Sequence, residues 1–205
     1  MHYIDLSRTI TPDLPCWPND PPLVLEQITK YGFVIDNIVN TGMHIGTHID
    51  AAQHMIAGGK SLAQYPVSKF IGRGVILDAS GRDTIDVDLL EDVYMQPGDI
   101  VLVHTGRDKA FGVPAYFETY PVFTEAFGYK LVEHKISMVG MDSPTPDNYP
   151  FPVHQLLLQH DVLIIEMLTN LDKLFGISKF TVIALPPKFD TAGAFARVIA
   201  FVDKI

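Results

Sequence analysis

The segment from His44 to His54 constrains this chain most, because three histidines and an aspartate recur in it at short spacings. Imidazole and carboxylate groups are common protein ligands of catalytic divalent metals such as zinc and manganese. Side chains alternate between two faces of an extended backbone, so His44, His48 and Asp50 fall on one face. The other face is mostly apolar. This pattern predicts a strand that carries metal ligands on one side and anchors in the core on the other.

A helix would also bring His44 and His48 together, since residues four apart are neighbours on a helix surface. Gly46 and the β-branched residues on either side of it favour the strand instead. A single histidine is more often an ordinary surface or core residue than a metal ligand. Three of them in phase with an aspartate reverse that preference and favour metal binding.

Length and composition narrow the classes of function. A chain of 205 residues predicts one domain over residues 1–205, with room for a sizeable core. The net charge of −9 disfavours a nucleic-acid or anionic-membrane surface, and no apolar run reaches the roughly 18 residues that span a bilayer. Cys16 is the only cysteine, so an internal disulfide is excluded. The first five residues lack the pattern of a secretory signal, so we expect a cytoplasmic protein.

The pattern of apolar residues predicts a mixed, β-rich α/β fold with few helices. Five prolines make residues 11–22 a stiff loop, and the second of the two strands predicted after it, residues 33–40, runs into the histidine segment. We expect strands over residues 2–8, 23–29, 33–40, 74–79, 100–105, 136–141, 162–166, 181–185 and 195–202, and helices over residues 86–94, 122–135 and 153–160.

A second metal would need ligands from elsewhere in the chain. Glu166 ends an apolar run where burial is expected, and an unpaired buried carboxylate is costly, so a metal is a natural partner. His154 opens a predicted helix beyond a proline-rich loop. The alternative for Glu166 is a surface residue at the end of a strand, and the alternative for His154 is an ordinary polar residue of the helix. The other histidines of the C-terminal half of the chain are His104, His134 and His160.

These motifs resemble the signature of the cyclase family of metal-dependent hydrolases, which includes bacterial kynurenine formamidase and isatin hydrolase. The signature is His44-x-Gly46-Thr47-His48-x-Asp50 followed by His54. The resemblance covers nearly the whole chain and includes Asp5-Leu6-Ser7, Trp17-Pro18-Asn19-Asp20-Pro21, Pro97-Gly98-Asp99, His104-Thr105-Gly106, Gly140-Met141-Asp142-Ser143-Pro144 and the spaced pair His154 and Glu166. It implies a swivelling β/β/α domain that assembles as a homodimer or homotetramer.

The resemblance also assigns roles to individual residues. It implies two divalent ions per chain, with zinc the first candidate and manganese the second. It implies that His44, His48 and Asp50 hold one ion, that Asp50 bridges to the other, and that His154 and Glu166 complete the second site. His54 would transfer the proton. Ala52 stands where the family usually has proline, and Asn19 where it often has glycine; neither change removes a ligand.

We therefore expect a metal-dependent amidohydrolase that cleaves a non-peptide C–N bond of a small aromatic substrate by metal-bound hydroxide. Arylformamidase activity on N-formylkynurenine, a step of tryptophan catabolism, is the leading candidate implied by the resemblance. Trp17, in the stiff loop, would stack on the substrate; the alternative is that it packs against its own domain. The rival functions are ring-opening of a lactam or lactone as in isatin hydrolase, the reverse cyclisation, and a non-catalytic metal-binding protein.

Overall fold

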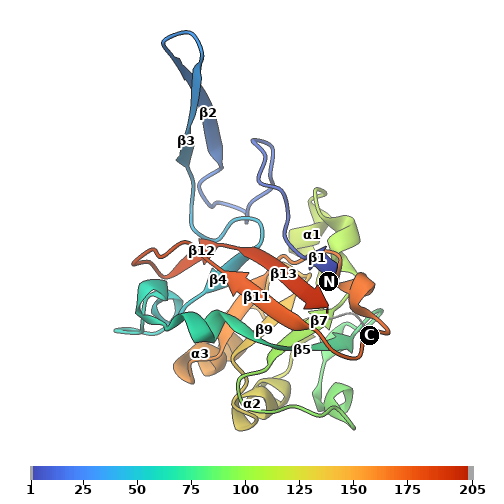
Figure 1. The fold of residues 1–205 in the computed structure, drawn as a ribbon. Helices are drawn as coiled ribbons and strands as arrows, with labels where there is room; N and C mark the ends of the chain where they lie inside the picture. The colour runs from blue at the N-terminus through green and yellow to red at the C-terminus, as the bar shows by residue number, and fades with distance from the viewer. Residues whose placement is uncertain (1, 203–205) are drawn as a thin grey trace.

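A computed structural model describes residues 2–202, and its main element is a curled sheet of nine strands (Figure 1). The strand order is β1-β13-β11-β5-β7-β9-β10-β4-β12. The bounds are β1 His2–Asp5, β4 His48–Asp50, β5 Ile71–Asp78, β7 Ile100–His104, β9 Met138–Met141, β10 Leu163–Glu166, β11 Thr181–Leu185, β12 Gly193–Phe195 and β13 Arg197–Val202.

The sheet combines two kinds of pairing. Strands β5, β7, β9 and β10 are parallel to one another, and antiparallel pairs extend the sheet on both sides of them. Parallel strands require crossover connections, which here include the helices α2 (Glu125–Glu133) and α3 (Pro152–Gln159). The predicted mixed, β-rich α/β class is confirmed.

Two hydrophobic cores separate three layers, and β7 shows how one strand serves both. Ile100 and Leu102 face the core under the antiparallel strands β1, β11 and β13, whereas Val101 and Val103 face the core under the helices. All four side chains are buried. This alternation is what a strand covered on both faces requires. The layers are therefore antiparallel strands, parallel strands and helices, the β/β/α arrangement that the resemblance implied.

A hairpin projects from this body (Figure 1). It consists of β2 (Val24–Lys30) and β3 (Val34–Asn40), which pair only with each other among the strands of residues 2–202. Both strands were predicted. The remaining elements are short: β6 Thr84–Ile85, β8 Val122–Phe123, α1 Ala115–Glu118, and the 3-10 turns Ala52–His54, Leu62–Gln64, Val67–Phe70, Val87–Leu90, Arg107–Ala110 and Leu171–Leu174. Within residues 2–202, no helix has the length and hydropathy needed to cross a bilayer.

The helix predicted over residues 86–94 is wrong, since only a single 3-10 turn forms there. The carboxylate of Asp86 accepts from the backbone N–H of Val87, at 2.8 Å, so it competes with helical hydrogen bonding. Asp92 adopts a left-handed backbone with φ of 61°, which ends any helical run. Smaller errors concern boundaries: the first strand stops at Asp5, the helix predicted over 122–135 begins as β8, and the last predicted strand is divided into β12 and β13.

The strand predicted through His44 is also shorter than expected, because β4 begins at His48. Gly46 adopts a left-handed backbone with φ of 55°, which turns the chain just before the strand. The predicted anchoring holds, since Ile45 and Ile49 are buried. His44 thus reaches the site from a turn and not from the strand face.

Candidate metal centre

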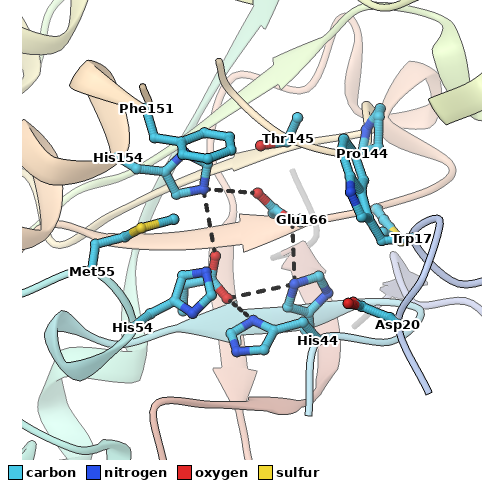
Figure 2. Close-up of a pocket in the computed structure, with 13 residues that line it drawn as sticks. Trp17, Asp20, His44, His54, Met55, Pro144, Thr145, Phe151, His154 and Glu166 are labelled. Carbon is cyan, nitrogen blue, oxygen red and sulfur yellow. Dashed lines mark hydrogen bonds and ion pairs between the residues drawn. The ribbon is translucent and has the colours of Figure 1, made fainter. Parts of the chain in front are cut away.

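The structure brings the five predicted metal ligands together from three separate parts of the chain (Figure 2). They form two groups that share Asp50: one with His44 and His48, the other with His154 and Glu166. In each group, one ligand atom per residue lies within 4.8 Å of the others. The arrangement therefore has two sets of donors that meet at a single carboxylate.

The distances centre on that carboxylate. Oδ1 of Asp50 lies 2.6 Å from Nδ1 of His44 and 3.5 Å from Nε2 of His48. Its Oδ2 lies 3.8 Å from Nε2 of His154. Glu166 closes the ring, with Oε2 at 3.2 Å from His48 and Oε1 at 3.3 Å from His154. Asp50, His48, His154 and Glu166 are all buried.

The register of the sheet places three of these side chains on one face. Glu166 in β10 is directly opposite His48 in β4, and Asp50 is two residues further along the same strand. Cross-strand partners and residues two apart share a face of the sheet. That face is the helix side, because Ile164, opposite Asp50, belongs to the core under α2 and α3.

His44 is held by a close approach of backbone from the other neighbouring strand. Gly193 in β12 pairs with Asp50. A Cβ atom at Gly193 would lie 2.6 Å from Cε1 of His44 and 2.9 Å from the carbonyl oxygen of Ile49. Only glycine leaves room for the His44 ring at this position. The sequence around the histidine segment did not predict that position 193 must be glycine.

His154 has a partner that the sequence analysis missed. Its Nδ1 donates to Oδ1 of Asp147, while Oδ2 of the same carboxylate accepts from the backbone N–H groups of Val153 at 2.7 Å and His154 at 3.2 Å. Asp147 is 4% exposed. The corresponding nitrogen of His48 faces the backbone oxygen of Gly46, at 2.8 Å. Both imidazoles are thus oriented from the side away from the carboxylate cluster.

The charges of the cluster are strongly coupled. Burial by itself would lower the pKa of His48 and His154, but the carboxylates around them raise the pKa of His48 to about 9 and that of His154 to about 10. Burial would raise the pKa of the Asp50 carboxyl, yet the neighbouring imidazoles, His44 foremost, hold that pKa far below its usual range. Burial and the charge of Asp50 would raise the pKa of Glu166, but the neighbouring imidazoles of His154 and His48 outweigh them and lower it.

The residues present fit divalent ions. Nε2 of His48 and Oε1 of Glu166 are buried and make no hydrogen bond with any group in residues 2–202. Buried polar atoms without partners are rare and costly. Both point into the cluster, where an ion held by imidazole nitrogen and carboxylate oxygen would satisfy them. The donor set suits zinc or manganese.

A cavity of about 310 Å³ opens onto this cluster (Figure 2). His54 lines it, with its ring centroid 4.1 Å from that of His44 and 6.2 Å from that of His154. Burial lowers the pKa of His54, and this effect outweighs the attraction of Asp50. Within residues 2–202, neither group of metal donors includes His54. The ring therefore lies beside the cluster as a neutral imidazole.

Trp17 forms part of the opposite wall of the cavity. Its ring meets Phe117 edge-on at a centroid distance of 5.7 Å and Tyr120 at 6.2 Å. It thus packs against its own chain, which is the second of the two alternatives drawn from the sequence, and it also lines the cavity. The other lining residues are Asp20, Met55, Pro144, Thr145, Phe151 and Met167.

The other histidines considered for a second metal lie elsewhere. His134 and His160 each donate from Nδ1 to a carbonyl of their own helix, at 2.8 Å. His104 belongs to a separate group with Asp108 and Asp142. The carboxylate of Asp142 already accepts three hydrogen bonds, from Thr105 N, Thr105 Oγ1 and Gly106 N. These hydrogen bonds give the Asp142 carboxylate a structural role in holding the backbone at Thr105 and Gly106.

Comparison with known proteins gives a match to the family model Cyclase, described as "Putative cyclase", over residues 4–148. An uncharacterized protein of Methanocaldococcus jannaschii is 32% identical over 202 residues, which cover 98% of this chain and 99% of the relative. A kynurenine formamidase of Bacillus cytotoxicus is 27% identical over 170 residues, covering 80% of each chain.

Solved structures extend the similarity to the fold. The crystal structure of an isatin hydrolase bound to the product analogue thioisatinate superimposes with a TM-score of 0.88 at 25% identity. The match covers 98% of this chain and 92% of that one. The formamidase and the isatin hydrolase are hydrolases by name, and their names give different substrates.

Proposed function

The chain belongs to the cyclase family, and from that premise we propose that it is a metal-dependent hydrolase of small aromatic amides, with N-formylkynurenine as the first candidate substrate. The observation that carries the metal dependence is the buried donor cluster around Asp50, in which Nε2 of His48 and Oε1 of Glu166 make no hydrogen bond within residues 2–202. The formamidase reaction is supported by the similarity to a kynurenine formamidase over four fifths of the chain.

We assign one divalent ion to His44, His48 and Asp50, and a second to Asp50, His154 and Glu166. When bound, such ions lower the pKa of a coordinated water to about 7 and polarise a carbonyl oxygen. The protein supplies the fixed orientation of these donors. Burial also excludes competing water, so every charge in the cluster interacts more strongly than it would in solvent.

His54 is the proposed proton carrier. Its lowered pKa keeps the imidazole neutral at pH 7, so it can accept a proton from the attacking water. As an imidazolium it then returns the proton to the leaving nitrogen. Its position beside His44, outside both donor groups, suits a residue that serves the reacting atoms without holding an ion.

Trp17 is the proposed contact for the aromatic ring of the substrate. It stands across the cavity from His54, and its own edge-on neighbours Phe117 and Tyr120 fix its plane. Met55 and Phe151 add apolar surface to the wall. A cavity of about 310 Å³ with one end lined by donors suits a small aromatic amide.

A panel of substrates tests this proposal. Protein loaded with zinc or with manganese is given N-formylkynurenine, isatin and simple lactones, and metal-stripped protein serves as the control. We expect the formyl amide to be hydrolysed and the stripped protein to be inactive. Turnover of isatin or a lactone alone would reject the formamidase assignment and favour the ring-opening reaction, which the similarity to isatin hydrolase supports. Tight metal binding with no turnover of any of these compounds would favour a non-catalytic role.

A further inference from the structure

Asp147 is a buried carboxylate that joins two features of the protein with its two oxygens. Oδ2 accepts from the backbone N–H groups of Val153 and His154 in the first turn of α3. Oδ1 accepts from Nδ1 of the His154 ring. One side chain therefore fixes both the start of the helix and the orientation of the imidazole that this helix carries.

This contact decides which nitrogen of His154 faces the cluster. A carboxylate oxygen only accepts, so Nδ1 must carry the hydrogen. Nε2 is then the nitrogen directed at Asp50 and Glu166, at 3.8 Å and 3.3 Å. In the neutral ring with hydrogen on Nδ1, the lone pair that a metal requires lies on Nε2.

The two other imidazoles of the cluster are oriented differently. His48 is oriented by a backbone oxygen, which no substitution of a side chain removes. His44 turns its Nδ1 towards Asp50 itself. Among these three histidines, His154 alone depends on a carboxylate outside the two donor groups.

We propose that Asp147 is a positioning residue for the second metal site, acting through His154 on the ion held by His154, Glu166 and Asp50. The inference rests on the proposed function, since it takes His154 as a metal ligand. Its consequence is selective: loss of the carboxylate weakens one of the two ions and leaves the ion at His44 and His48 in place.

Asp147→Asn is the sharpest substitution because it preserves the shape. The amide oxygen can still accept from the start of α3, and the amide nitrogen then faces Nδ1 of His154. An NH₂ group donates, so Nδ1 must become the acceptor and the hydrogen moves to Nε2. The lone pair is thereby removed from the nitrogen that faces Glu166. The variant keeps the helix cap and reverses the tautomer.

The experiment is a metal titration of stripped protein, with zinc followed by calorimetry and cobalt by its absorption spectrum. We expect two equivalents in the unmodified protein. In Asp147→Asn, affinity for one of them should fall 10- to 100-fold, the usual range for loss of such an outer partner. His154→Ala should lose the same equivalent altogether. Asp86→Asn is the matched control, because Asp86 also accepts a backbone N–H at the start of a helical turn but lies in no donor group.

Each outcome separates the possibilities. If His154→Ala binds both ions as before, His154 is no ligand and the proposed metal assignment fails. If His154→Ala loses an ion while Asp147→Asn titrates like the unmodified protein, the role of Asp147 is refuted. Equal weakening of both ions, accompanied by a lower midpoint of thermal unfolding, would show a merely structural role. If Asp147→Asn does not fold, Asp147→Ser repeats the titration with a hydroxyl that still accepts from Val153.

Discussion

Substitution of His54 by alanine separates proton transfer from metal binding. The ring lies against His44 but contributes no atom to either donor group of residues 2–202. We therefore expect His54→Ala to keep both ions. The side chain is only partly buried and ends a 3-10 turn, so the free energy of unfolding should change by about 1 kcal/mol or less.

The expected loss is in the rate. General acid–base catalysis contributes about 10²- to 10⁴-fold, which corresponds to about 3–5 kcal/mol of transition-state free energy. The loss should appear in kcat on whichever substrate of the panel is turned over. KM should change little, because Trp17 and the apolar wall of the cavity remain.

The assay pairs steady-state kinetics with metal analysis of the same preparation. His134→Ala is the matched control, since that half-buried histidine bonds only to a carbonyl of its own helix. A His54→Ala protein that loses an ion would make His54 a ligand and refute the assignment. A protein with both ions and an unchanged rate would show that the proton travels by another route.

Four further outcomes follow from the geometry. Asp50→Ala should abolish binding of both ions and activity together, as measured by metal analysis; retention of one full equivalent would contradict a shared carboxylate. Trp17→Ala should weaken the binding of an aromatic substrate by about 1–3 kcal/mol, measured from KM or from inhibitor affinity, and leave the metal content unchanged. Gly193→Ala should displace His44 and weaken the ion at that group, measured by zinc titration. Burial lowers the pKa of His48 and His154, but the neighbouring carboxylates outweigh it and raise these values to about 9 and about 10. A metal binds only the deprotonated rings. Zinc affinity should therefore rise with pH from about 6 towards 9, with proton release seen as a dependence of the calorimetric heat on the buffer.

The histidine segment shows what a periodic pattern predicts and what it does not. Alternation placed Ile45 and Ile49 in the core and His48 and Asp50 on one face, and the structure agrees. The same alternation assigned His44 to a continuous strand, which is wrong. Gly46 turns the chain by a left-handed conformation that periodicity does not reveal. His44 and Asp50 still meet, because the turn brings the ring back over the strand.

Asp147 and Gly193 lay beyond sequence reasoning for a different reason. Neither belongs to a run of metal-ligand residues, and each acts through a contact that only the fold creates. Gly193 meets His44 because β12 pairs with β4. Asp147 meets His154 because the loop before α3 folds back on the first turn of the helix. Local patterns predict ligands, whereas the residues that orient ligands depend on tertiary pairing.

The core and the donor cluster are specified by one strand register. Glu166 is opposite His48 only while Ile165 is opposite Ile49, and the two isoleucines belong to the core under the antiparallel strands. A slip of one residue between β10 and β4 would move the carboxylate to that core and bring an isoleucine into the donor cluster. Burial of a carboxylate among apolar side chains costs several kcal/mol. Hydrophobic packing on one face of β10 therefore holds Glu166 in place on the other, without any metal being needed to set the register.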